Sequence, residues 1–147
     1  MGDKIYKGSC SCGAVELTVA GLTTIIGFCH CGDCRGWQGA PVTALSLWTP
    51  DKVKVLKGEE HIGVYMKTPI SERKFCKLCG GHLLTAHPGG AAKGLIDVYA
   101  AAIIPEYPFE PRMHIHYRER VVRIHDGQPK YRDLPAEYGG SGELVPE

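Results

Sequence analysis

The sequence has no long apolar run, no apolar leader and no excess of one charge. Its first ten residues, MGDKIYKGSC, contain no apolar segment of the kind found in a secretory signal. No stretch reaches the roughly 18 apolar residues that span a bilayer. The formal net charge is +1, so the chain lacks the basic field that attracts phosphates. We therefore expect a cytoplasmic protein whose partners include neither a membrane nor a nucleic acid.

Asparagine is absent as well, and so is any extended helical pattern. The chain has 19 glycines and 10 prolines, so its tight turns fall mainly to glycine. Short alternating stretches predict strands instead: Val15, Leu17 and Val19 alternate with Glu16 and Thr18. Similar stretches cover residues 24–28, 41–48, 52–56, 62–66, 95–99, 113–117 and 121–124.

This pattern predicts a single all-β domain of short antiparallel strands over residues 1–138. One or two turns of helix are expected after Cys31. The segment 139–147 is small and polar, which predicts a mobile tail. A chain of 147 residues is long enough to bury a core without covalent cross-links.

The seven cysteines fall into three clusters at chelating spacing, and their odd number argues against a disulfide framework. In an extended Cys-x-Cys the two side chains point the same way, with Cα atoms about 6.6 Å apart, so both sulfurs can reach one ion. A Cys-x-x-Cys turns, and a following glycine lets main-chain amides approach the sulfurs. The clusters are Cys10 and Cys12; Cys29, Cys31 and Cys34; and Cys76 and Cys79.

Seven sulfurs divide into four and three, which predicts two zinc ions per chain. Structural zinc takes four protein ligands, whereas catalytic zinc commonly takes three and keeps one position open. We expect the outer pairs, Cys10 and Cys12 with Cys76 and Cys79, to form the closed site. The middle cluster, Cys29, Cys31 and Cys34, would form the open one.

Two blander interpretations of the cysteines stay open. The cysteines could be buried core residues without a metal. Alternatively, the middle cluster could be a second closed site completed by His30, His82 or His114. His30 is the weakest of these, because alternation places it on the face opposite Cys29 and Cys31.

The motifs around these cysteines resemble those of the glutathione-dependent formaldehyde-activating enzyme family. The resemblance covers about residues 5 to 131, and several spaced motifs recur in order. They are Gly8-Ser-Cys10-Ser-Cys12-Gly13-Ala-Val15, Cys29-His30-Cys31-Gly-Asp33-Cys34-Arg35, Gly39-Ala40-Pro41, Arg73-Lys-Phe75-Cys76-Lys-Leu-Cys79-Gly80, His114-Ile115 and Asp126-Gly127-Gln-Pro129-Lys-Tyr131. Where the family tends to have an aromatic residue after the His-Ile pair, this sequence has His116.

The resemblance implies an Mss4-like fold with the same division of ligands between a structural and a catalytic zinc. It also implies a carbon–sulfur lyase activity: joining glutathione to formaldehyde as S-hydroxymethylglutathione, or the reverse cleavage. The expected partners are therefore a thiol such as glutathione and a small aldehyde. The rival hypothesis is a zinc-stabilised protein-binding module of the same fold. A third hypothesis, methionine-sulfoxide reduction on a related fold, would need a redox-active cysteine outside the metal sites. All seven cysteines are assigned to those sites, so this hypothesis ranks last.

Ligand chemistry favours thiol capture over hydrolysis. Three thiolates blunt the Lewis acidity of zinc, and a sulfur-rich site suits a fourth thiolate. A free thiol with a pKa of about 8.5 is only about 3% ionised at pH 7, so full ionisation gains at most about 30-fold. Most of the acceleration must then come from holding the aldehyde against the sulfur. This predicts a pocket beside Cys29–Cys34, with Trp37 as a wall or as plain core.

Four other polar residues are candidates with competing roles. Asp33 either moves the thiol proton or bonds to loop amides, as Asp readily does. Arg35 either offsets the charge of the thiolates or is solvated. His114 and His116 are expected to share one face of a strand, where they either line the pocket or are half-buried structural residues.

Overall fold

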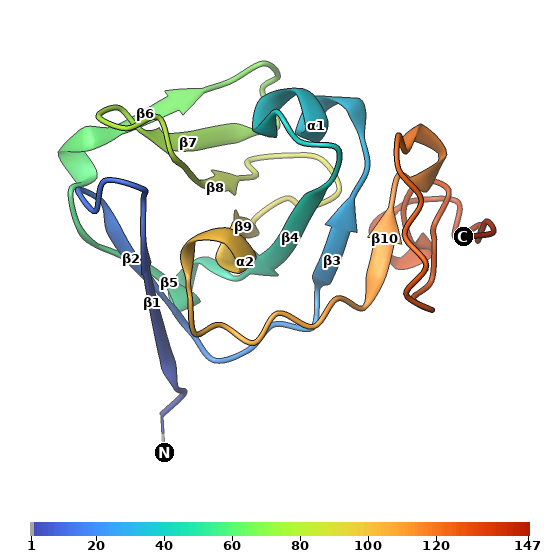
Figure 1. The fold of residues 1–147 in the computed structure, drawn as a ribbon, viewed down its shortest axis with the longest axis horizontal. Helices are drawn as coiled ribbons and strands as arrows, with labels where there is room; N and C mark the ends of the chain where they lie inside the picture. Colours follow the sequence, from blue (N-terminus) through green and yellow to red (C-terminus); the bar gives the residue numbers. More distant parts are fainter. Residues whose placement is uncertain (1) are drawn as a thin grey trace. The chain divides into compact units, whose positions relative to one another are not determined.

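The structure, a computed structural model, describes residues 2–147 and consists mainly of short strands (Figure 1). The two helices are α1 (Gly32–Gln38) and α2 (Ala100–Ile103), and the four single turns of 3-10 helix are η1 (Pro50–Lys52), η2 (Glu59–His61), η3 (Tyr117–Glu119) and η4 (Ala136–Tyr138). The strands are β1 (Ile5–Ser9), β2 (Glu16–Ala20), β3 (Ile26–Cys29), β4 (Thr43–Trp48), β5 (Val53–Lys57), β6 (Ile62–Tyr65), β7 (Glu72–Cys76), β8 (His82–Ala86), β9 (Ile96–Val98) and β10 (Met113–Ile115). The expected all-β class is confirmed.

The chain forms two compact units. The first comprises the residues up to Thr24 together with Ser46–Phe109, and the second comprises Ile25–Leu45 and Glu110–Glu147. The division passes through β4. The single domain over residues 1–138 and the mobile tail over residues 139–147 stay predictions. In the structure, the tail residue Val145 donates its N–H to the carbonyl of Lys130 at 2.9 Å.

The first unit contains a small antiparallel sheet in the order β1-β2-β5. The alternation read from the sequence is visible here, because Val15, Leu17 and Val19 are fully buried. Burying three such side chains stabilises the unit by several kcal/mol, at about 1.5–3 kcal/mol for each. This sheet places Cys10 and Cys12 in the turn that joins β1 to β2.

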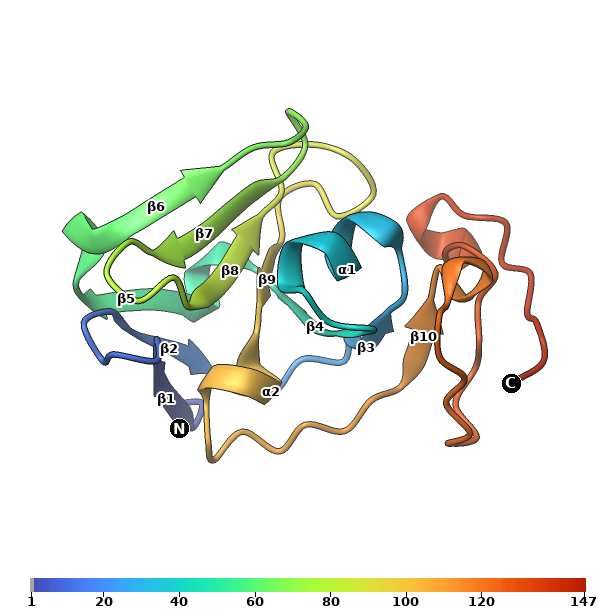
Figure 2. The same ribbon diagram turned by 45° about the horizontal axis from the view of Figure 1, so that its top comes forward.

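A second set of antiparallel strands in the first unit runs in the order β9-β8-β7-β6 (Figure 2). Leu83 and Val98 are fully buried in it. Cys76 is the last residue of β7, and Cys79 lies in the turn between β7 and β8. This turn is closed by two main-chain hydrogen bonds, from Gly80 N to Cys76 O at 2.8 Å and from Cys76 N to Gly81 O at 2.8 Å.

The second unit is built on the parallel pairing of β10 with β3, in which His114 lies opposite Phe28 and Ile115 opposite Cys29. Gly27 permits this pairing, because a Cβ atom there would lie 2.0 Å from the carbonyl oxygen of Met113. The strands therefore approach more closely than any other residue at position 27 would allow. Cys29 ends β3, and α1 begins three residues later.

Several local expectations were wrong or incomplete. Val121–Ile124 is irregular rather than a strand, and the strand predicted over residues 113–117 ends at Ile115. The pairing of β10 with β3 departs from the expected antiparallel arrangement. Strands β1, β7 and β8 had not been predicted. The short helix expected after Cys31 is confirmed as α1.

Among the described residues, no helix has the length and apolar character needed to cross a membrane.

The contact at Gly27 gives a prediction about stability. Gly27→Ala should lower the free energy of unfolding by about 1–3 kcal/mol, because the new methyl group must displace the main chain of β10. Gly36→Ala is the matched control, since a Cβ atom at Gly36 in α1 meets nothing within 4 Å. It should leave stability unchanged or raise it by up to about 1 kcal/mol. Urea denaturation measures both, and equal losses in the two variants would contradict the close approach.

Candidate metal centres

Four sulfur atoms from the two cysteine turns of the first unit meet in one place. The Sγ atoms of Cys10, Cys12, Cys76 and Cys79 all lie within 4.8 Å of one another, and we call them the four-sulfur group. The Sγ–Sγ distances are 3.7 Å from Cys10 to Cys12 and 3.9 Å from Cys12 to Cys76. A tetrahedral zinc with Zn–S bonds of about 2.3 Å requires Sγ–Sγ distances of about 3.8 Å. These two distances match a closed tetrahedral site, and the bound of 4.8 Å keeps all four sulfurs close enough to share one ion.

Main-chain amides point at these sulfurs, as the following glycines led us to expect. Val15 N donates to Cys10 Sγ at 3.3 Å, and Gly81 N donates to Cys79 Sγ at 3.4 Å. Hydrogen bonds from the amides of Cys12 and Gly81 lower the pKa of Cys79 to about 6. These two amides thus stabilise the thiolate form of Cys79, which is the form that binds metals.

Three sulfur atoms of the second unit form a separate group. The Sγ atoms of Cys29, Cys31 and Cys34 lie within 4.8 Å of one another, and we call them the three-sulfur group. Cys31 is the N-cap of α1, and its Sγ accepts a hydrogen bond from Cys34 N at 3.3 Å. Hydrogen bonds from the thiols of Cys29 and Cys34 lower the pKa of Cys31. The negative charge of the group therefore settles first on Cys31.

Arg35 and Glu119 hold the main chain around the three-sulfur group. The Arg35 guanidinium donates to His30 O and to Glu119 O, each at 3.1 Å. The Glu119 carboxylate accepts from Gly32 N at 3.1 Å. Arg35 thus ties the cysteine loop to η3, a structural task that neither sequence hypothesis for this residue had included.

The expectation that His114 and His116 share one strand face was wrong. The strand ends at Ile115, and His116 takes a left-handed conformation with φ of 52°. Its Nδ1 lies 3.6 Å from a Glu119 oxygen, and its charge contributes to lowering the pKa of Cys31. His114 is fully buried and turns away into a different set of contacts. Asp33 and Trp37 lie on α1, and the pocket expected beside them stays a prediction.

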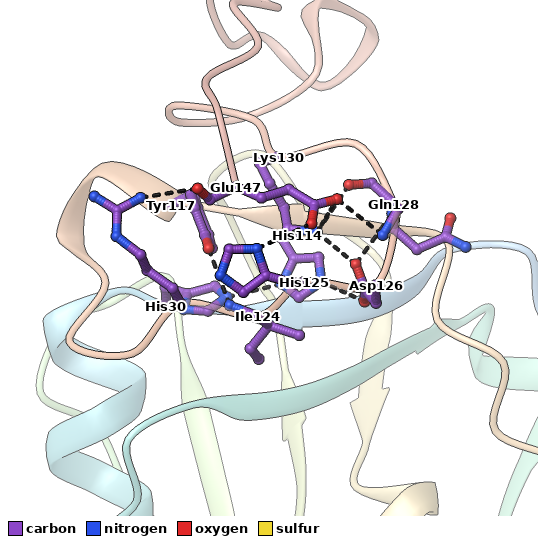
Figure 3. Close-up of polar contacts among 11 residues, drawn as sticks. His30, His114, Tyr117, Ile124, His125, Asp126, Gln128, Lys130 and Glu147 are labelled. Carbon is purple, nitrogen blue, oxygen red and sulfur yellow. Dashed lines mark hydrogen bonds and ion pairs between the residues drawn. The ribbon is translucent and has the colours of Figure 1, made fainter.

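His30 and His114, two of the candidate fourth ligands, are bonded to each other instead (Figure 3). His30 Nε2 and His114 Nδ1 are 2.9 Å apart, and both side chains are fully buried. Burial lowers the pKa of His30 to about 4. The third candidate, His82, begins β8 in the first unit. Among the described residues, none of these histidines belongs to the three-sulfur group.

Asp126 and Lys130 were missed by the sequence reasoning as functional candidates. His114 Nε2 lies 2.8 Å from Asp126 Oδ2, and the fully buried Lys130 forms an ion pair with Asp126 Oδ1. These residues follow β10 in a segment whose pairing with β10 is an isolated bridge between Lys130 and His114, and no periodicity marks a side chain there as buried. The only signal in the sequence is the run Asp126-Gly127-Gln-Pro129-Lys. It had been interpreted as part of a family motif, and not as a set of residues that contact His114.

The donor chemistry of both groups fits zinc. Thiolates select soft or borderline metals and disfavour magnesium and calcium, which take oxygen ligands. Four sulfurs would close a tetrahedral coordination sphere, whereas three would leave one position for an exchangeable ligand. The division into four and three that was expected from spacing is therefore the grouping that the sulfur positions support.

Most of the chain is similar to known proteins. A family model described as "Glutathione-dependent formaldehyde-activating enzyme" matches residues 5–119. An uncharacterized lyase of Schizosaccharomyces pombe is 30% identical over 110 residues, which cover 75% of this chain and 78% of that protein. A candidate glutathione-dependent formaldehyde-activating enzyme of Pyrenophora teres f. teres is 31% identical over 108 residues, which cover 67% of this chain and 55% of that protein.

A solved structure shares the fold. The crystal structure of a Rhodobacter sphaeroides protein superposes on this chain with a TM-score of 0.57 and 24% sequence identity. The match covers 69% of this chain and 91% of that chain.

A Cys→Ser substitution should have different effects in the two sulfur groups. Cys76→Ser should remove one zinc and lower Tm by roughly 10 °C or more, because zinc in the four-sulfur group would contribute directly to folding. Cys31→Ser should remove the other zinc and leave most of the fold. Elemental analysis and thermal unfolding of the two variants measure this difference. Equal collapse of both would indicate two structural sites.

Proposed function

Because this chain belongs to the glutathione-dependent formaldehyde-activating enzyme family, we propose that it is a zinc-dependent carbon–sulfur lyase. It would add a thiol to a small aldehyde and catalyse the reverse cleavage, with glutathione and formaldehyde as the leading pair. The single observation that carries the proposal is the three-sulfur group, in which three ligands and no fourth candidate donor gather among the described residues. This arrangement is typical of a site that keeps one position for substrate.

We assign the four-sulfur group, Cys10, Cys12, Cys76 and Cys79, as ligands of a structural zinc. The three-sulfur group, Cys29, Cys31 and Cys34, would hold the catalytic zinc. When bound there, zinc supplies a positive charge that favours the thiolate form of a substrate thiol at neutral pH. Three ligand thiolates outweigh that charge by one unit, which disfavours ionising water and so disfavours a hydrolase.

The overall reaction balances without any redox partner. The substrate sulfur forms a bond to the carbonyl carbon while the carbon–oxygen π bond breaks, and the proton lost by the thiol ends on the oxygen. No electrons are exchanged with a cofactor. The chain therefore needs only to favour the thiolate, to hold the aldehyde beside it and to let one proton pass.

Hydrogen bonds around the three-sulfur group hold its loop in place, which supports this task. Cys34 N donates to Cys31 Sγ, and Arg35 and Glu119 each bond the main chain of the loop. His116 brings an imidazole close enough to influence the charge of Cys31. Ionising the thiol contributes at most about 30-fold, so most of the rate must come from holding the reactants in place. A rigid loop is what such catalysis requires.

Cobalt substitution tests the proposal. With cobalt in the three-sulfur group, adding glutathione should strengthen the sulfur-to-metal charge-transfer absorption as a fourth sulfur joins the three. Glutathione should act at concentrations roughly tenfold lower than mercaptoethanol if the site recognises more than a thiol. Formaldehyde added afterwards should reverse or shift the change as the adduct forms.

Cys31→Ser is the control, because it should remove the response and leave the spectrum of cobalt in the four-sulfur group. A wild-type spectrum indifferent to every thiol would overturn the proposal and favour the binding module. A response to mercaptoethanol but not to glutathione would keep the thiol site and discard the proposed substrate.

A further inference from the structure

A row of two hydrogen bonds, one buried and one partly buried, leads from Asp126 to the cysteine loop (Figure 3). Asp126 Oδ2 lies 2.8 Å from His114 Nε2, and His114 Nδ1 lies 2.9 Å from His30 Nε2. Both imidazole side chains are fully buried, whereas the Asp126 side chain is 26% exposed. We call these three residues the histidine chain. All three belong to the second unit, as does the three-sulfur group.

The Asp126 carboxylate is fixed at both oxygens. Oδ2 faces His114, while Oδ1 accepts from the Lys130 ammonium and from Gln128 N at 3.0 Å. Burial raises the pKa of Asp126, but the hydrogen bonds from Lys130, His114 and Gln128 outweigh it and hold the pKa well below its usual range. Lys130 itself is fully buried and lies 3.5 Å from a Glu147 oxygen. Asp126 is therefore an ionised group that can only accept hydrogen bonds.

An acceptor at one end sets the direction of every bond in the histidine chain. His114 must donate from Nε2 to Asp126, so a neutral His114 accepts at Nδ1, and His30 must donate from Nε2. The other end of the histidine chain, at His30, is consistent with this direction. His30 Nδ1 is buried and has no hydrogen-bond partner among the described residues. The opposite direction would place an unpaired N–H there, which costs more than leaving a lone pair unpaired.

His30 transmits this constraint to the cysteines through the main chain. It stands between Cys29 and Cys31, and its own N–H and carbonyl are both bonded, to Ile115 O and from Arg35 Nε, each at 3.1 Å. Its ring packs edge-on against Tyr117, with 4.8 Å between the ring centroids. A residue whose ring and both main-chain groups are held in this way has little conformational freedom. The Cα–Cβ directions of its two neighbours are then largely fixed.

We propose that the histidine chain positions the three-sulfur group: Asp126, His114 and His30 act as positioning residues that fix the main chain from which Cys29 and Cys31 extend. This proposal rests on the proposed metal-binding role of the three-sulfur group. It assigns a task to three residues that neither hold the metal nor touch the reacting atoms. Partners behind the ligands typically change metal affinity by about 10- to 100-fold.

The proposal is tested by cobalt binding to a matched pair of variants. His30→Leu keeps an apolar side chain of similar bulk and removes the donor, so cobalt affinity at the three-sulfur group should fall about 10- to 100-fold. His30→Gln retains an amide N–H in place of Nε2–H and should restore affinity to within about threefold of wild type, since the bond to His114 survives. Cobalt in the four-sulfur group, and Tm, report whether each variant is folded.

A double-mutant cycle distinguishes positioning from general packing. His114→Leu should weaken cobalt binding like His30→Leu, and combining them should add no further loss, because both break the same chain. Additive losses would overturn the proposal, as would wild-type affinity in His30→Leu. A wild-type protein that binds only one cobalt would instead overturn the ligand assignment of the proposed function. The two failures are therefore distinguishable.

A measurement on the unaltered protein covers the case in which the leucine variants do not fold. Nitrogen-15 NMR of the zinc-loaded full chain, labelled at histidine, reports which ring nitrogen carries the proton. We expect His30 and His114 both to be protonated at Nε2 and bare at Nδ1, with ring protons that exchange slowly. A proton on Nδ1 of either residue would overturn the proposed direction and with it the positioning chain.

Discussion

The structure depends on one constraint: sulfur atoms from distant parts of the chain must lie within a few ångströms of one another. Neighbouring sulfurs of the four-sulfur group are 3.7 and 3.9 Å apart, although Cys12 and Cys76 are 64 residues apart in sequence. Thiolates at such distances repel each other, and a divalent cation between them converts that repulsion into attraction. Two short turns, each closed by glycine and by amides that point at sulfur, supply the geometry. We infer that a metal bound there would contribute the free energy that joins them.

The three-sulfur group is held together differently from the four-sulfur group. Its three sulfurs come from a single stretch of six residues, so no distant segment has to be joined. What it needs is a fixed loop, and three separate contacts provide it: the amide of Cys34 on Cys31, the Arg35 guanidinium on His30, and the buried ring of His30. A site that has one fewer protein ligand loses the rigidity that a fourth bond would give. In our proposal, hydrogen bonds to the loop would replace that rigidity and leave the remaining position of a bound metal available for substrate.

Sequence reasoning succeeded where the chemistry is local. The spacing of the cysteines correctly predicted which sulfurs lie together, and the alternation of Val15, Leu17 and Val19 correctly predicted a strand with a buried face. It failed where distant pairing decides the outcome. The burial of His114 follows from the parallel pairing of β10 with β3, which Gly27 permits and which no local pattern announces. The stretch 121–124 was expected to be a strand, yet Val121 is 59% exposed and Ile124 N is bonded to the Tyr117 hydroxyl instead of a neighbouring strand.

The central claim is that one metal site is closed by protein sulfur and the other is completed by a substrate thiol. X-ray absorption at the zinc edge, on protein carrying two zinc ions, counts the sulfur neighbours directly at a Zn–S distance of about 2.3 Å. The four-sulfur and three-sulfur groups together predict an average of about 3.5 sulfurs per zinc in the free protein. Saturating glutathione should raise this average to about 4, with loss of one lighter neighbour at the open site. An average that does not change on adding glutathione would contradict the account.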